Sequence, residues 1–567
     1  MRALALLVLC AACSAGTPGP GLDTERVLGH VGALTAIGPR PGNSPAAGAA
    51  LDYIERELAA IGVTAQRWPV GAVDLPDITV MGVTYRRAHR AESLDPNLVV
   101  RFGPPGRALL VMAHYDTVPG SPGAVDNAAA VGALIELARV LSAQGAPLPV
   151  MLAFTANEEI GLVGAESLAA RSVQDPIALA VALDLVGGSG DLVLNGASTL
   201  ISRDDLRWLA RAADRAGVVL RVPLAHRVIS RWWPQAERSD HGAFTRRAIR
   251  GIHFYNRGQD GEWIDLAYHS RRDTADRVDR GSVDELGRLL VALASEAPPE
   301  PAAHDGFWLP LATNLVVPRW LVQLVELALA IGALALLVGV RTARTRGGLG
   351  LLPALAAYAL ACMLAFVVER FSPAPWVHAP LAFAIAELLV IGGALGLVAI
   401  AARRARPWIG DLRYLALAAS LLLVPGVALL LFDGAELAWI WLVPAAIVAA
   451  APRAAVLRWL ALPAAALPAL LVLAPNQLRE AVWNGFLPPG IPFALLLAVF
   501  ALPVAAVGAY LVRRGGATGP LGSFVLPLGC LLSVITGVVL VLRAHPPCTP
   551  ADFNQFGLAC EVIPRVR

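Results

Sequence analysis

Apolar and polar positions divide the 567-residue chain into two parts of different character. Between about 25 and 305, short apolar runs of strand length alternate with longer runs in which apolar residues recur at helical spacing. The predicted strands are 107–114, 148–156, 177–187 and 249–256, and the predicted helices are 127–143, 162–172, 204–217 and 282–296. Apolar strands that alternate with helices predict an α/β fold, with a mostly parallel sheet flanked by helices.

From about residue 316 the pattern changes to repeated apolar runs separated by short charged or proline-containing breaks. Eight of these runs have, or approach, the length that a helix needs to cross ~30 Å of hydrocarbon. They cover 318–340, 349–369, 381–402, 414–432, 436–451, 459–474, 491–512 and 521–542. We therefore expect an all-α polytopic membrane domain of about eight transmembrane helices at 316–543, followed by a tail at 544–567.

The loops between the predicted spans differ in their arginine content. Loops that begin at Arg341, Arg403 and Arg513 are rich in arginine, whereas the intervening loops carry far fewer. The positive-inside rule places arginine-rich loops in the cytoplasm. The domain at 25–305 and the C-terminal tail are then extracytoplasmic, on the periplasmic or extracellular side, or lumenal in a eukaryotic cell.

The N-terminus and the cysteines agree with export. Residues 1–20 contain one arginine, an apolar run of about ten residues and then small residues, which is typical of a signal peptide or a short N-terminal anchor. Lipidation at Cys13 is an alternative that the sequence leaves open. Cys548 and Cys560 lie in the tail, where an oxidising compartment would favour a disulfide bond between them.

Charged residues make up only 16% of the chain, and its net charge is +3. No basic stripe interleaved with aromatic residues is present, so nucleic acid is not an expected partner. Against this apolar background the stretch VMAHYDTVPGSPGAVDNAAAVGAL stands out, because it places His114, Asp116 and Asp126 around a loop that follows a predicted strand.

Further acids and a histidine follow the other predicted strands. Glu158 and Glu159 follow the strand at 148–156, Asp184 lies at the end of the next one, and His269 comes later. The carboxyl ends of parallel strands meet at one edge of a sheet, where ligands bind. A single residue of this kind more often caps a helix or forms a turn. Together these carboxylates and imidazoles predict a site for paired divalent metals at a hydrolytic centre.

Six segments carry a resemblance to a known family. HYDTV, GAVDNAAAV, NEEIGLVGAESLA, ALDLVGG, SDHGAF and YHSRRDT resemble, in order and spacing, the motifs of the zinc metallopeptidases of family M28, over about 90–285. The resemblance implies a phosphorylase/hydrolase-like peptidase domain that binds two zinc ions. Such a domain followed by several spans is similar to the endoplasmic-reticulum metallopeptidase and vacuolar membrane protease branch of this family.

The resemblance also implies a role for each metal-binding residue. One zinc is expected at His114 and Asp184, the other at Glu159 and His269, and Asp126 is expected to bridge both. In some members of the branch a glutamate takes the place of Asp184.

The remaining roles are implied in the same way. Glu158 is the expected general base, and Asp116 is expected to orient His114, as carboxylates do for metal-bound imidazoles. A cis peptide bond is expected between Asp126 and Asn127, and Asp240 is a candidate substrate-binding residue. The chain departs from the family in having AAAV where a Ser-Gly pair is frequent and Ser270 where threonine is common.

These expectations favour a membrane-anchored di-zinc exopeptidase, an aminopeptidase that acts on peptides outside the cytoplasm. Two alternatives stay open. A glutaminyl-peptide cyclase uses similar ligands around one zinc, and a transporter or receptor could carry an inactive, peptidase-like sensory domain. The expected partners are a peptide substrate and the lipid bilayer, with the oligomeric state left open. Glu326 and Glu387 lie within predicted spans, where acids are costly and are either functional or hydrogen-bonded between helices.

Overall fold

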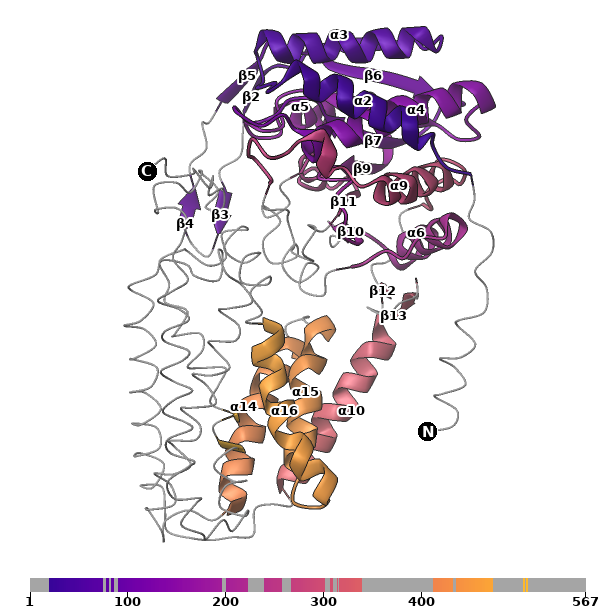
Figure 1. The fold of residues 1–567 in the computed structure, drawn as a ribbon. Coiled ribbons are helices and arrows are strands. Elements are labelled where there is room, and N and C mark those ends of the chain that lie inside the picture. The colour runs from indigo at the N-terminus through magenta and orange to yellow at the C-terminus, as the bar shows by residue number, and fades with distance from the viewer. Residues whose placement is uncertain are drawn as a thin grey trace, which may run out of the picture. The chain divides into compact units, whose positions relative to one another are not determined.

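The computed structural model describes residues 20–74, 78–80, 83–85, 90–195, 200–222, 239–256, 267–300, 306–308, 314, 316–338, 411–431, 435–472, 503–504 and 506–507. The chain divides into two compact units, Met1–Arg319 and Trp320–Arg567, which Figure 1 shows as ribbons. Several predictions lie outside the described residues: the signal segment, the arginine-rich loops that begin at Arg341, Arg403 and Arg513, Glu387, and the pair Cys548 and Cys560.

The first unit contains strands and helices in alternation. Its strands are β1 (Gln66–Trp68), β2 (Gly71–Asp74), β3 (Ile78–Val80), β4 (Val83–Tyr85), β5 (Arg90–Ser93), β6 (Asn97–Phe102), β7 (Ala108–His114), β8 (Val150–Thr155), β9 (Ile177–Leu183), β10 (Leu192–Asn195), β11 (Gly251–Asn256), β12 (Gly306–Trp308) and β13 (Val316–Pro318). Its helices are α2 (Thr24–Ile37), α3 (Pro45–Ala60), α4 (Ala129–Gln144), α5 (Val163–Arg171), α6 (Arg203–Ala216), α8 (His241–Thr245) and α9 (Arg280–Leu293), with the short turns η1 (Ala124–Ala128) and η3 (Ala275–Arg277).

The central sheet is mixed: its centre is parallel, as predicted, and antiparallel pairs flank that centre. Its seven described strands are ordered β1-β6-β8-β7-β9-β11-β10. The four inner strands β8, β7, β9 and β11 are parallel, whereas β1, β6 and β10 pair antiparallel with their neighbours. The segments 103–107, before β7, and 184–191, before β10, are too short to hold a crossover helix. A parallel connection needs a dozen or more residues, so the chain reverses at both places.

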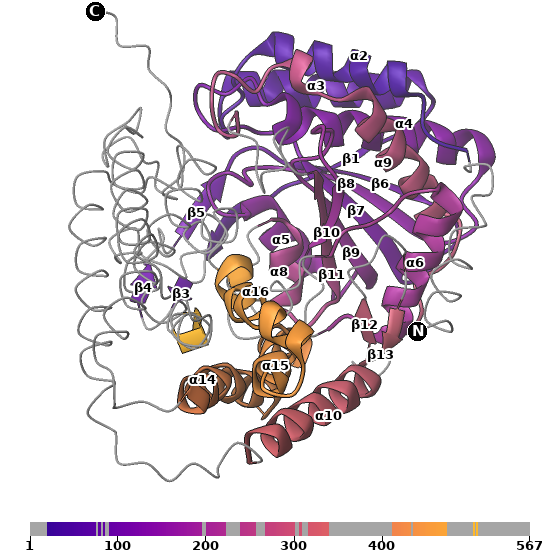
Figure 2. The same ribbon diagram turned by 60° about the horizontal axis from the view of Figure 1, so that its bottom comes forward.

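Helices cover both faces of this sheet (Figure 2). Alternate strand residues belong to two separate cores: Leu109 and Val111 pack with α2, α3, α4, α6 and α9, whereas Leu110 and Met112 pack with α5 and α8. Every residue of β7 is buried, which explains why the strand reads as one continuous apolar run. The polar groups that follow β7, β8 and β9 therefore lie at the edge of a rigid, three-layered scaffold.

The second unit is helical in its described part. It contains α10 (Arg319–Val338), α14 (Asp411–Leu431), α15 (Ala435–Ala450) and α16 (Ala455–Val472), which fall on four of the predicted spans. Among the described helices, one stretch, Arg319–Leu337, is long and apolar enough to cross a membrane by length and composition. The apolar parts of the other three are shorter.

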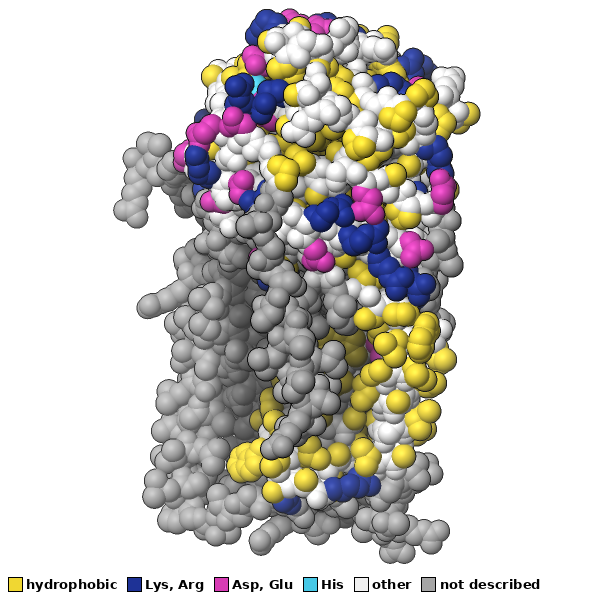
Figure 3. All heavy atoms as spheres, turned by 90° about the vertical axis from the view of Figure 1, so that its right-hand side faces the viewer, with side chains coloured by type: hydrophobic (Ala, Val, Ile, Leu, Met, Phe, Trp, Pro, Cys, Tyr) yellow, Lys and Arg dark blue, Asp and Glu magenta, His cyan; other side chains and the backbone are white. Residues whose placement is uncertain are grey.

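Helix α10 carries exposed apolar residues and one buried acid. Figure 3 shows apolar side chains gathered along this helix, and its large exposed residues are Trp320, Leu321, Leu324, Val325, Leu327, Ile331 and Leu334. Glu326 on the same helix is buried and accepts a hydrogen bond of 3.0 Å from the main-chain amide of Trp439 in α15. The acid thus links two helices of the second unit.

Candidate metal centre

The residues predicted to bind metal come together at the carboxyl ends of the parallel strands. His114 is the last residue of β7, Glu158 and Glu159 follow β8, and Asp184 follows β9. Asp126 lies in η1 and His269 in the turn that precedes η3. Together they form three overlapping groups whose ligand atoms lie within 4.8 Å of one another: His114, Glu158 and Glu159; His114, Asp126 and Asp184; Asp126, Glu159 and His269.

Asp126 stands between two histidines. Its Oδ1 lies 3.2 Å from Nε2 of His114, and its Oδ2 lies 3.3 Å from Nε2 of His269. On the outer sides, Oδ1 of Asp184 is 3.5 Å from Nε2 of His114, and Oε2 of Glu159 is 3.0 Å from Nε2 of His269. One carboxylate thus faces two separate sets of donors, the arrangement required of a bridging ligand.

The polar atoms of this cluster fit a cation better than they fit one another. Nε2 of His114, Oε1 of Glu159 and Oδ1 of Asp184 are buried and make no hydrogen bond within the described part of the chain. Buried polar atoms are ordinarily hydrogen-bonded, so three exceptions at one place call for a physical cause. Imidazole nitrogens and carboxylate oxygens are ligands of zinc, and the donor set present here suits that metal.

Burial and unbalanced charge shift the pKa values of these groups. Burial alone would raise the pKa of Asp126, but hydrogen bonds from His114 and His269 hold it well below its usual range. Burial would lower the pKa of His269, yet Glu159 and Asp126 raise it to about 10. Burial raises the pKa of Glu159 to about 7 and that of Glu158 well above its ordinary value. The buried acids therefore outnumber the positively charged groups that could stabilise their ionised forms.

The turn that carries Asp126 is held from two sides. The bond between Asp126 and Asn127 is cis, as the resemblance implies. The carboxylate of Asp273 accepts hydrogen bonds from the main-chain amides of Val125 and Asp126, at 2.8 and 3.0 Å. The side-chain amide of Asn127 donates to the carbonyl of Leu183, at 2.7 Å. The helix expected from residue 127 consequently begins at Ala129, after the irregular turn η1.

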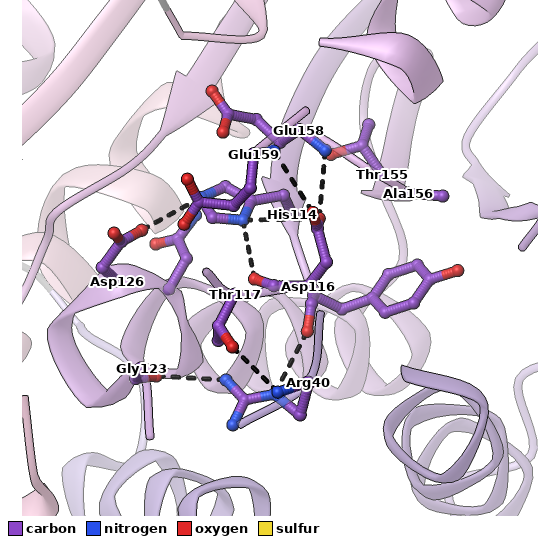
Figure 4. A network of polar contacts seen from close by, with 12 residues as sticks. Arg40, His114, Asp116, Thr117, Gly123, Asp126, Thr155, Ala156, Glu158 and Glu159 are labelled. Atoms are coloured by element: carbon purple, nitrogen blue, oxygen red, sulfur yellow. Dashed lines mark hydrogen bonds and ion pairs between the residues drawn. The ribbon is translucent and has the colours of Figure 1, made fainter. Parts of the chain in front are cut away.

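Asp116 differs from the expectation in the way it contacts His114. Its main-chain carbonyl, not its carboxylate, lies at hydrogen-bond distance from Nδ1 of His114, at 3.0 Å. The nearest carboxylate oxygen is 3.7 Å from that nitrogen. The carboxylate accepts instead from the main-chain amides of Glu158 and Glu159, at 3.1 and 3.2 Å (Figure 4). Asp116 therefore positions the glutamate loop as well as the histidine.

Asp240 belongs to the same electrostatic environment. It is buried, its Oδ2 accepts a hydrogen bond from the hydroxyl of Thr155 at the end of β8, and its Oδ1 has no hydrogen-bond partner among the described residues. Burial raises the pKa of Asp240 to about 7. Nearby, His253 stacks on His241 and contacts the main-chain carbonyl of Asp184, at 3.2 Å. Asp240 thus offers one uncommitted oxygen beside the cluster.

Two residues that shape the centre were missed by the sequence analysis. Asp273 lies in the quoted segment YHSRRDT, so a signal for it was present but only the histidine was used. Arg40 is buried below the loop that follows β7 and donates to main-chain carbonyls there (Figure 4). Because its partners are backbone atoms, no particular residue type in the sequence reveals them.

Comparison with known proteins agrees with this geometry. Residues 97–294 match Peptidase family M28. The chain is 27% identical over 196 residues to aminopeptidase YwaD of Bacillus subtilis, which covers 33% of this chain and 40% of that protein. It is 26% identical over 205 residues to a vacuolar membrane protease of Clavispora lusitaniae, covering 34% of this chain and 18% of that protein. The matched segments thus span less than half the length of either relative.

Among solved structures, an aminopeptidase from Aneurinibacillus sp. strain AM-1 aligns with 50% of this chain and 95% of its own, at 16% identity and a TM-score of 0.38. The family match begins at the first residue of β6 and ends just after α9, so it includes every strand end that contributes to the cluster. Residues 97–294 of this chain are therefore a domain of peptidase family M28.

Proposed function

We propose that this domain is a di-zinc aminopeptidase that removes N-terminal residues from peptides. The observation that carries the proposal is the carboxylate of Asp126, whose two oxygens face His114 and His269 at 3.2 and 3.3 Å. A carboxylate shared in this way is expected between two cations and has no evident use around one.

The distances support the following ligand assignment. His114 and Asp184 would hold one zinc ion, Glu159 and His269 would hold the other, and Asp126 would contact both. Zinc ions at such a site supply Lewis-acid polarisation and a more acidic water. The uncommitted atoms on His114, Glu159 and Asp184 support this assignment, because each is an atom that the proposed coordination would use.

Glu158 is the proposed general base. It is adjacent to the ligand Glu159 in the chain, and burial raises its pKa well above the ordinary value of a glutamate. Carboxylates are among the side chains that act as general bases in enzymes. The carboxylate of Glu158 would accept a proton from the attacking water and return it to the leaving amine. The amide of Glu158 is fixed by the carboxylate of Asp116, which keeps the base in place.

Asp240 is the proposed partner of the substrate's α-ammonium group. Its Oδ1 is buried and has no hydrogen-bond partner in the described part of the chain, so a cationic substrate group could pair with it. An acid that requires a free amine favours action at the N-terminus of a peptide over cleavage within it.

The setting of the domain is also part of the proposal. The apolar helix α10 and the further predicted spans would anchor the chain, with the peptidase domain outside the cytoplasm. The tail would lie on the same side of the membrane and would contain a disulfide bond between Cys548 and Cys560. In the test of topology, an Arg346→Cys variant resists an impermeant thiol reagent in intact cells. Labelling of that cysteine from outside would overturn the orientation.

The activity is tested on the full chain purified in detergent. We expect two equivalents of zinc, and hydrolysis of an aminoacyl chromogenic substrate but not of its N-acetylated form. Cyclisation of an N-terminal glutamine peptide without hydrolysis would identify a glutaminyl cyclase instead. A chain that binds no zinc and is inactive on all three substrates would favour the inactive sensory domain.

A further inference from the structure

The segment between α2 and α3 reaches the metal centre from outside the region that matches the family. Its Arg40 precedes residue 97 by more than fifty positions and is 1% exposed. The guanidinium donates to five main-chain carbonyls, those of Leu34, Gly38, Tyr115, Pro122 and Gly123, at 2.7–3.2 Å. Three of the carbonyls lie at Nη1, whose two hydrogens they share, and Nε and Nη2 each donate to one. Among side chains, only arginine presents N–H donors from three nitrogens in a fixed planar array.

Three of these carbonyls, those of Tyr115, Pro122 and Gly123, belong to the loop that joins His114 to Asp126. The other two, those of Leu34 and Gly38, belong to the end of α2 and to the segment of Arg40 itself. Tyr115 follows His114 directly, and Gly123 precedes Asp126 by three residues. Gly123 has a left-handed backbone (φ 64°), and a Cβ there would overlap Thr117. The main chain of Arg40 is tied to Thr117 in both directions, since its amide donates to Oγ1 at 2.8 Å and its carbonyl accepts from the amide at 3.1 Å.

The other end of the same segment contacts the glutamate loop. Oδ1 of Asn43 accepts from Nδ2 of Asn157, the residue before Glu158, at 3.1 Å. Asn157 has a left-handed backbone (φ 55°) and packs against Gly42 so closely that a Cβ on Gly42 would lie 1.5 Å from its Oδ1. One short segment therefore holds both halves of the ligand set.

We propose that residues 38–44 form a brace that fixes the distance between the two ligand loops, with Arg40 as its principal positioning residue. This inference rests on the proposed zinc-dependent function. It assigns a positioning role to residues that lie outside the family match. Supporting groups behind metal ligands typically change metal affinity ~10–100-fold when removed.

The test compares Arg40→Met with Arg250→Met in the full chain. Arg250 is a matched control, because it is 5% exposed and also buried in the first unit, but it pairs with Asp205 and the carbonyl of Ala178 at the other edge of the sheet. Zinc retention is measured against increasing chelator. We expect Arg40→Met to release zinc at roughly tenfold or more lower chelator concentration. Arg250→Met should match the wild type, and Arg40→Lys should fall between.

A second readout needs no metal. In chelator-stripped protein, amide hydrogen exchange over 114–128 should accelerate relative to the rest of the first unit in Arg40→Met, whereas Arg250→Met should show no acceleration confined to that segment. Gly42→Ala should accelerate exchange over 156–162. Equal zinc retention in the two arginine variants, with equal exchange, would overturn the brace. A wild-type chain without zinc would instead overturn the proposed function, and the exchange data would still decide on the brace.

Discussion

Buried charges are arranged differently at the amino ends and at the carboxyl ends of the parallel strands. At the amino ends of the parallel strands, Arg250 pairs with Asp205, whose other oxygen accepts from the amide and hydroxyl of Ser202. Every polar group of that set has a partner. At the carboxyl ends, several acids surround two histidines, and buried atoms of His114 and Asp184 make no hydrogen bond within the described chain.

This difference separates a structural set of charges from a functional one. A buried ion pair with both partners present adds little net stability, but the removal of one partner is strongly destabilising. A buried set with excess negative charge would be stabilised by a bound cation. Perturbed pKa values such as those of Glu158, Glu159 and Asp240 gather at sites of this second kind.

The largest effect is expected for Glu158, the proposed general base at the carboxyl ends of the parallel strands. Glu158→Gln should lower kcat by roughly 10²–10⁴-fold, since the amide cannot accept the proton, while zinc content stays near that of the wild type. Steady-state kinetics and elemental analysis measure the two quantities. The matched control is Glu136→Gln, which alters another buried glutamate of the first unit, paired with Arg139, and should leave kcat unchanged. Activity of Glu158→Gln within a few fold of the wild type would remove its assigned role.

Asp126→Ala should remove the link between the two ligand groups. Because this carboxylate faces both His114 and His269, we expect the loss of at least one zinc equivalent per chain. Elemental analysis after dialysis provides the measurement. Retention of two equivalents would show that the acid is not a bridge.

A substitution at the amino ends of the strands should lower the free energy of unfolding and leave zinc affinity unchanged. Arg250→Met leaves Asp205 buried without its cation, and breaking such a pair costs about 3–5 kcal/mol. Denaturant unfolding of the metal-loaded chain, followed by near-ultraviolet circular dichroism, would measure the loss. A fall in zinc affinity of the same size as in Arg40→Met would contradict the separation of the two edges.

The smallest effect concerns a cluster formed by residues of α2, α3 and α4. His30 is buried between Tyr53, with its hydroxyl 2.7 Å from Nδ1, and Glu136. Burial lowers the pKa of His30 below 6.5, although Glu57 and Glu136 oppose this. The unfolded chain therefore binds the proton more readily than the folded one. Stability should fall as the pH drops through 6.5. The fall should be shallower in His30→Gln, and identical slopes would exclude His30 as its source.

The inner strands, and the proximity of the candidate ligands that follow them, could be predicted, because complete burial on both faces leaves an unbroken apolar run such as β7. The antiparallel strands β6 and β10 could not, since their direction depends on the short connections 103–107 and 184–191 and not on their own residues. Arg40 was missed for a related reason. Backbone carbonyls are present in every residue, so a side chain that binds only to them leaves no complementary pattern in the sequence.

The main-chain partner of His114 shows the same limit. A carboxylate two positions away predicts a direct contact, whereas the fold turns the carbonyl of Asp116 toward the ring and the carboxylate toward Glu158 and Glu159. Residue types indicate which groups are available. Their directions are set by the backbone path, which only the folded chain defines.

The spread of the ligands along the chain has a consequence for the order of assembly. His114 and His269 meet only when β7, β8 and β9 have paired and the turn before η3 has closed on η1. Such distant contacts form late, because loop closure must precede them. An unfolded chain offers no preformed site, so under the proposed function metal binding would be coupled to folding. For an exported chain, the supply of metal in the receiving compartment would then control maturation.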